Sequence, residues 1–123
     1  MRGDVAMRFA PLVSVLILLS TPVLAGPLEN GVASYNRADY ATAMKTLEPL
    51  AQQGNVDAMY TVSLMYSKGR GVTQDSVKAY VYLDQMAKSG DKDAASDRDA
   101  LASGMTPDQL SDAQKKSAEW KSK

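Results

Sequence analysis

Apolar and small residues recur at helical spacing in three successive stretches, residues 38–54, 57–69 and 75–90. In the last stretch, positions i, i+3, i+4, i+7 and i+8 hold Ala79, Tyr82, Leu83, Met86 and Ala87. The same spacing selects Ala58, Thr61, Val62, Met65 and Tyr66 in the second stretch, and Ala43, Leu47, Leu50 and Ala51 line up similarly in the first. Such spacing is typical of the buried face of an α-helix. No stretch sustains alternation with period two, so the pattern predicts an all-α fold.

Residues that start and stop helices agree with this division. Gly54 and Gly90 are predicted to end two of the helices in a left-handed conformation. A short carboxylate stands at or near each expected helix start, where it can cap a free backbone N–H. These residues are Asp39, Asp57, Asp75, Asp93 and Asp108. Pro49 is expected to bend the last turn of its helix or to remove a hydrogen bond there.

Several of these positions repeat at a distance of 36 residues. Gly54 and Gly90 are one such pair, and Asp57 and Asp93 are another. The others are Ala43 with Ala79, Ala51 with Ala87, and Ala58 with Ala94. Self-similarity of this kind predicts stacked helix pairs, each of which buries its apolar face on the next.

The segment 58–90 resembles the Sel-one-like repeat, a relative of the tetratricopeptide repeat. The matching positions are Ala58, Leu64 with Met65, Tyr66, Gly69, Gly71-Val72, Gln74-Asp75, Lys78-Ala79, Tyr82, Met86-Ala87 and Gly90. Tyr82 stands where the family often has tryptophan, and Met86 where it often has alanine. Both residues keep an apolar group at the position.

The resemblance implies a fold and a general role. It implies a short right-handed α-solenoid of about three antiparallel helix pairs, over residues 26–54, 57–90 and 93–123. Repeats of this family generally mediate protein–protein contacts, so the expected function is that of an adaptor or scaffold with a protein or peptide partner. Two alternatives stay open: a cell-envelope factor that binds glycan or peptidoglycan, and a component of a larger envelope assembly.

The loop in "SKGRGVTQDSVKAY" (residues 67–80) has two possible interpretations. Its glycines could cradle a phosphate, or the loop could connect the two helices of one repeat. A P-loop needs Lys-Ser/Thr after its last glycine, and a dinucleotide fingerprint needs a third glycine after a strand. The sequence has neither, which favours a connector between two helices. In this interpretation Gly69 and Gly71 supply backbone freedom. Val72 packs between the two helices, and Asp75 caps the second of them.

The first 25 residues have the pattern of a cleaved secretory signal. Arg2 and Arg8 precede a short apolar run, and Val23 and Ala25 place small residues before a cut at Ala25–Gly26. The run is shorter than the roughly 20 residues of a membrane span. The expected location is therefore the bacterial periplasm or the exterior. Removal of the leader would leave 12 basic and 13 acidic side chains, out of 14 of each in the whole sequence.

Composition narrows the chemistry further. The sequence contains no histidine and no cysteine, and its formal net charge is zero. These features remove the commonest general base, metal ligand and thiolate nucleophile, and they give no electrostatic footprint for nucleic acid. The cluster Asp91, Asp93, Asp97 and Asp99 lacks the central glycine and the final glutamate of a calcium loop. We therefore expect no enzyme activity, no cofactor and no metal.

Four residues are candidates for partner binding. Tyr60 and Tyr80 lie off the predicted buried stripes, whereas Tyr66 and Tyr82 lie on them. The first two either pack against an adjacent helix pair or form contact points in a binding groove. Arg70 in the long connector and Arg37 in the short one are expected to help hold a carboxylate or an acidic partner.

Overall fold

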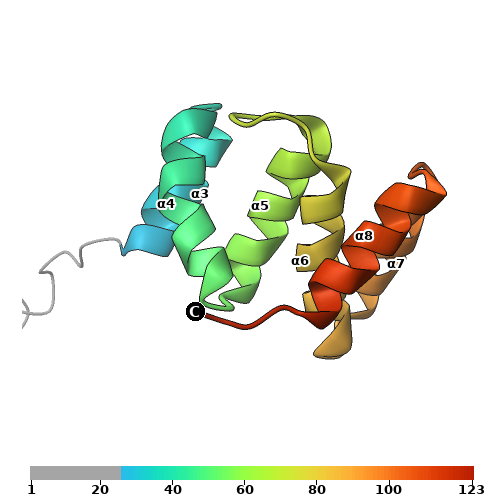
Figure 1. The fold of residues 1–123 in the computed structure, drawn as a ribbon. Coiled ribbons are helices and arrows are strands. Elements are labelled where there is room, and N and C mark those ends of the chain that lie inside the picture. Colours follow the sequence, from blue (N-terminus) through green and yellow to red (C-terminus); the bar gives the residue numbers. More distant parts are fainter. Residues whose placement is uncertain (1–25) are drawn as a thin grey trace, which may run out of the picture.

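The computed structural model describes residues 26–123, which form six α-helices and no strand (Figure 1). In chain order these are α3 (Pro27–Asn36), α4 (Tyr40–Gln52), α5 (Val56–Lys68), α6 (Ser76–Lys88), α7 (Lys92–Ala102) and α8 (Pro107–Ala118). The all-α class predicted from the spacing is therefore confirmed for this part of the chain. The signal sequence expected over residues 1–25 lies outside the described residues.

Successive helices from α3 to α7 contact each other, whereas α8 packs on α6 and not on its sequence neighbour α7. α3 contacts α4 and α5, α4 contacts α5, and α5 contacts α6. α6 then contacts both α7 and α8, while α7 and α8 make little or no contact with each other. The two helices expected as a final pair over 93–123 are thus both present, but each packs on α6.

Helix boundaries recur with the 36-residue offset seen in the sequence. α4 begins at Tyr40 and α6 at Ser76, and both are 13 residues long. α5 and α7 begin at Val56 and Lys92 and keep the same offset. The recurrence extends to the caps, because Asp39 and Asp75 precede α4 and α6, and Asn55 and Asp91 precede α5 and α7.

The structure corrects part of the predicted capping. Asp39 and Asp75 do cap α4 and α6, with their side chains accepting from Thr42 N and Lys78 N. The other three helices with side-chain caps are capped two residues earlier than predicted, by Asn55, Asp91 and Thr106. The three aspartates predicted as caps there are Asp57, Asp93 and Asp108, and they lie in the first turn instead. A carboxylate in that turn still interacts favourably with the helix dipole.

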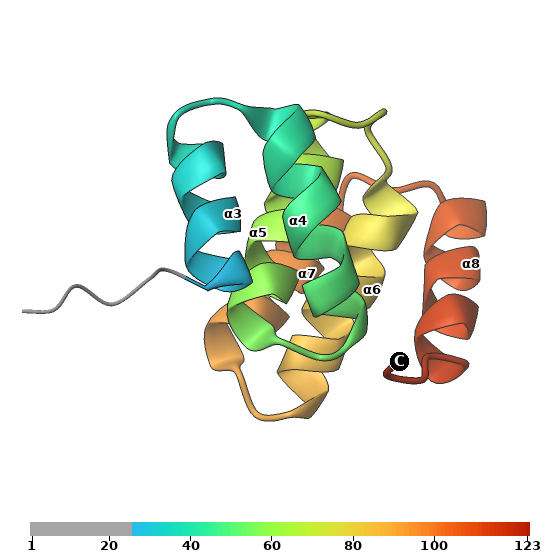
Figure 2. The same cartoon turned by 90° about the vertical axis from the view of Figure 1, so that its left-hand side faces the viewer.

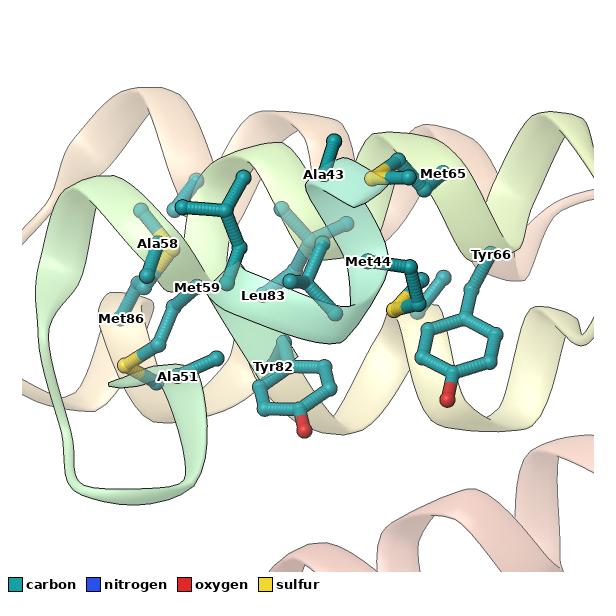
Figure 3. Packing of buried hydrophobic residues seen from close by; sticks show 14 residues of the cluster. Ala43, Met44, Ala51, Ala58, Met59, Met65, Tyr66, Tyr82, Leu83 and Met86 are labelled. Carbon is teal, nitrogen blue, oxygen red and sulfur yellow. The ribbon is translucent and has the colours of Figure 1, made fainter. Parts of the chain in front are cut away.

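The core is formed by the predicted stripes of α4, α5 and α6 (Figure 3). Leu47, Val62 and Met65 are fully buried at its centre. Tyr66 and Tyr82, predicted as core residues, are confirmed as buried, and their rings stack with centroids 6.5 Å apart. In Figure 3 both hydroxyls point out of the cluster on the same side.

The connector between α5 and α6 confirms the interpretation of "GRGVTQD" as a link between helices in contact. Gly69 ends α5 with a left-handed φ of 68°, and Asp75 caps α6. Val72 is half-buried against the core. Gly71 has a φ of 74°, and a Cβ atom there would lie 2.7 Å from the Tyr40 carbonyl oxygen. A side chain at position 71 is therefore excluded by both conformation and contact.

A buried carboxylate joins the last three helices. Asp84 of α6 accepts hydrogen bonds from Ser117 of α8 and, at 2.8 Å, from Arg98 of α7. The Lys88 ammonium lies 3.1 Å from the other carboxylate oxygen. Gln85 donates to the Ser117 carbonyl oxygen at 2.9 Å. These bonds give α7 and α8 polar attachments to α6 in addition to apolar contact.

The residues after α8 cross the molecule and attach to the end of α4, as Figure 1 shows. The Trp120 ring packs edge-on against Tyr82 with centroids 5.4 Å apart. Lys123 N donates to the Gln52 carbonyl oxygen at 2.9 Å, and the Ser122 hydroxyl donates to the Gln53 carbonyl oxygen at 2.8 Å. We call residues 119–123 the C-terminal strap.

Candidate partner-binding groove

Two large hydrophobic side chains are exposed in residues 26–123, and they are neighbours on one helix. Val56 is 49% exposed and Tyr60 is 42% exposed. They lie one turn apart on α5, at i and i+4, and therefore on the same face of the helix. Both side chains line the same hollow in the surface.

This hollow is an open groove of about 840 Å³ along α3, α5 and α7. Leu28 and Val32 line it from α3, and Asp93 and Asp97 from α7. Figure 2 shows α3, the lower part of α5 and the beginning of α7 along the left-hand edge of the molecule. We call it the α3/α5/α7 groove.

The groove carries negative charge only. Its acidic lining residues are Glu29, Asp57, Asp91, Asp93 and Asp97, and no Lys or Arg lines it. The Asp91 carboxylate caps α7 by accepting from Ala94 N at 3.0 Å. Within residues 26–123 the ion pairs involve Asp84, Asp99 and Asp112, so none of the groove carboxylates has a basic partner there.

Of the four residues predicted to bind a partner, Tyr60 alone lines this groove. Tyr80 is only 7% exposed, near the start of α6, which agrees with the alternative that it packs within the fold. It is therefore not available as an exposed contact point.

The two candidate arginines are engaged with neighbouring side chains. The Arg70 guanidinium donates to the Tyr35 hydroxyl at 2.7 Å and lies over the rings of Tyr35 and Tyr40, 5.9 and 5.6 Å from their centroids. Arg37 is exposed just after α3 and donates to the Ser34 hydroxyl at 3.3 Å. Arg70 thus joins the connector to α3 and α4, and neither arginine lines the groove.

The apolar residues of the groove were not among the residues predicted to bind a partner. Val56 precedes the predicted helix start, and Leu28 and Val32 lie in a segment for which no stripe was assigned. The available signal was the i, i+4 spacing of Leu28 with Val32 and of Val56 with Tyr60. These pairs lie outside the predicted buried stripes. An apolar residue there can be covered by another helix or exposed to solvent, and the packing of the neighbouring helices decides which.

A second, smaller hollow of about 200 Å³ lies between α4, α6 and the C-terminal strap. Tyr66, Tyr82 and Trp120 line it, and Tyr66 donates its hydroxyl to Glu48. Burial and the nearby Glu48 charge raise the pKa of Tyr82 to about 12. A hydrogen bond with Gln52 acts in the opposite direction and lowers this pKa, but by less. Burial, with the Glu48 hydrogen bond and charge, also raises the pKa of Tyr66. These buried phenols are engaged inside the fold and present no flat aromatic platform.

Two further observations bear on function. In residues 26–123 no group of three or more carboxylates comes together closely enough to hold a metal ion. None of the helices from α3 to α8 has the length and apolar character needed to cross a bilayer.

Comparison with protein families and with curated proteins identified no relative of this chain. No protein-family model matches the chain, and no curated protein matches it. The resemblance to Sel-one-like repeats therefore stays a prediction that rests on the motif residues of segment 58–90.

Proposed function

We propose that this chain is an exported, non-enzymatic protein-interaction module built from Sel-one-like repeats, and that the α3/α5/α7 groove receives its partner. One observation carries the proposal. The two large hydrophobic side chains exposed in residues 26–123 both line this groove. Large apolar side chains gathered at a concave surface mark interaction sites in proteins that otherwise bury such groups.

The repeat architecture is supported by the 36-residue offset in helix starts and caps. Asp39 and Asp75 occupy equivalent caps, as do Asn55 and Asp91. Units that share caps and boundaries can stack as antiparallel pairs in a short right-handed solenoid, each covering the apolar face of the next. In such a stack the first helices of successive pairs line one face, which here is the face of α3, α5 and α7.

Two parts of the proposal rest on the sequence. Export rests on the signal pattern in residues 1–25. The absence of an enzymatic role is supported by a chain without histidine or cysteine, which lacks the side chains most often used as base and nucleophile.

The proposal is tested by comparing partner capture by three forms of the protein from a bacterial envelope extract. The groove variant carries Val56→Ser and Tyr60→Ser. The matched control carries Gln114→Ser and Ala118→Ser, two exposed positions on α8 outside the groove. Circular dichroism first establishes that all three forms are equally helical.

We expect one protein to be captured by the unmodified and control forms and lost by the groove variant. Retention of that protein by the groove variant would place the contact elsewhere. Capture of peptidoglycan fragments without any protein would instead favour the glycan-binding alternative.

A further inference from the structure

We propose that the partner segment is a basic amphipathic helix, with an apolar stripe flanked on one side by Lys or Arg. This inference rests on the proposed function, because it concerns the occupant of the α3/α5/α7 groove. It reverses the charge expected from the sequence, where Arg70 and Arg37 suggested an acidic partner.

The apolar part of the groove has helical periodicity. Leu28 and Val32 are one turn apart on α3, and Val56 and Tyr60 are one turn apart on α5. α3 and α5 contact each other, so the two short stripes lie on adjoining helices. A partner helix with apolar side chains at i, i+3, i+4 and i+7 can pack its ridge between them, as amphipathic helices do in hydrophobic grooves.

Most of the negative charge of the groove lies on the α5 and α7 side, which carries four of its five carboxylates, while Glu29 on α3 is the fifth. Asp93 and Asp97 are one turn apart on α7. Asp57 is on α5, the helix that also carries Val56 and Tyr60. A helix seated on the apolar stripes would therefore present one flank to α7. Lys or Arg at i and i+4 on that flank matches the spacing of Asp93 and Asp97.

The positive ends of the helix dipoles compensate only part of the negative charge in the groove. Glu29, Asp57 and Asp93 stand in the first turns of their helices, where the dipole of about half a charge stabilises them in part. Asp97 lies further along α7, beyond the reach of that effect. No Lys or Arg of residues 26–123 lines the groove, so the remaining negative potential faces solvent and favours a cationic ligand.

The test uses three fluorescein-labelled synthetic peptides and measures fluorescence anisotropy. The first is an amphipathic 14-residue helix of Leu and Lys with a single apolar stripe. The second replaces each Lys by Glu, and the third has the composition of the first in an order that gives no apolar face. We expect the Leu/Lys helix to bind at least about tenfold more tightly than either of the others, with affinity falling as salt is raised.

Two double variants separate the contributions of charge and apolar contact. Asp57→Asn with Asp97→Asn should weaken binding of the Leu/Lys helix about fivefold, as expected for the loss of two exposed ion pairs. The matched control, Asp108→Asn with Glu119→Gln, neutralises two exposed carboxylates outside the groove and should leave binding unchanged. Val56→Ser with Tyr60→Ser should weaken it as well.

The outcomes distinguish the two proposals. Equal binding of the Lys and Glu helices, both lost with Val56→Ser and Tyr60→Ser, would overturn the basic partner and leave the groove as a binding site. Equal weakening by the groove and control charge variants would also overturn it, because the attraction would then be non-specific. Binding unaffected by the Val56 and Tyr60 changes would count against the groove itself.

Discussion

At the scale of single residues, Tyr82 and Asp84 are buried ionisable groups of α6 that respond to opposite ends of the pH range. Tyr82 is neutral and packed among aromatic rings, while Asp84, two positions later, is held by hydrogen-bond donors from α6, α7 and α8. Burial disfavours the charged form of each. For Tyr82 that effect dominates, whereas at Asp84 the donors outweigh it.

The raised pKa of Tyr82 predicts a loss of stability at high pH. Its folded-state pKa of about 12 exceeds the ordinary value of about 10, so the stabilisation is fully present below pH 10 and disappears as pH rises toward 12. Urea denaturation between pH 8 and 12 should show this decline. Tyr82→Phe should make the pH dependence shallower, whereas Tyr60→Phe, at an exposed position, should leave it unchanged. Equal effects of the two changes would contradict the assignment.

The lowered pKa of Asp84 predicts a loss of stability at low pH, the opposite of the dependence expected for Tyr82. Burial alone would raise its pKa, but hydrogen bonds from Ser117, Arg98 and Lys88 lower it below the usual value. Its stabilisation is therefore present above about pH 4 and is lost as pH falls through the lowered pKa. Asp84→Asn should cost about 1–3 kcal/mol at pH 7 and less near pH 3, measured by urea denaturation.

The control for this prediction is Asp112→Asn. Asp112 forms an exposed i, i+4 pair with Lys116 at 3.1 Å, and such pairs contribute at most about 1 kcal/mol. The role assigned to Asp84 would be wrong if its substitution cost no more than that of Asp112.

At the scale of elements, two glycines allow the effect of backbone conformation on a loop to be separated from that of close packing. One is in the connector between α5 and α6, and the other follows α6. Gly71 and Gly90 both have positive φ, 74° and 104°. A Cβ atom at Gly71 would meet the Tyr40 carbonyl oxygen at 2.7 Å, whereas one at Gly90 would have nothing within 4 Å. Conformational strain is common to both positions, and the steric contact is confined to Gly71.

We therefore expect Gly71→Ala to destabilise the fold by more than Gly90→Ala. Backbone strain should cost about 1–3 kcal/mol at each position. The contact with α4 should add a further loss at position 71, visible as a lower midpoint of thermal unfolding. If the two variants unfolded at the same temperature, the loop would be free to move away from Tyr40 at little cost.

The helices themselves were largely predictable, and their exact beginnings were not. Periodicity placed Leu47, Val62 and Leu83 on buried faces correctly. The expected caps at Asp57 and Asp93 were displaced because Asn55 and Asp91 offer equally good side-chain acceptors two positions earlier. Local sequence does not decide between neighbouring caps of similar strength, so boundaries depend on how the whole helix packs.

At the scale of the whole molecule, the α3/α5/α7 groove could not be predicted because it is formed by three helices together. Tyr60 was identified from one helix alone. The charge of the groove depends on which carboxylates of α3 and α7 come to lie beside it, and on Arg70 being engaged by Tyr35 elsewhere. Such information is non-local and arises only when helices distant in sequence pack together.

The C-terminal strap adds another non-local contact, because it connects the end of α8 to the end of α4. A linear stack of helices is held by contacts between neighbours, so its ends can unfold separately from its centre. Here Trp120 packs on Tyr82, and Lys123 N bonds to Gln52 O. We therefore expect the strap to couple the unfolding of α8 to that of α4.

Trp120 is the sole tryptophan of the chain, so its fluorescence reports on the strap directly. During urea denaturation, fluorescence and far-ultraviolet circular dichroism should give coincident transitions, because the strap detaches only when the helices unfold. Trp120→Ala should lower the free energy of unfolding by about 2 kcal/mol through lost burial and aromatic contact. Lys121→Ala, an exposed neighbour, should have little effect. A fluorescence change at lower urea than the loss of helicity would mean that the strap opens independently, and that α4 and α8 are coupled only through α6.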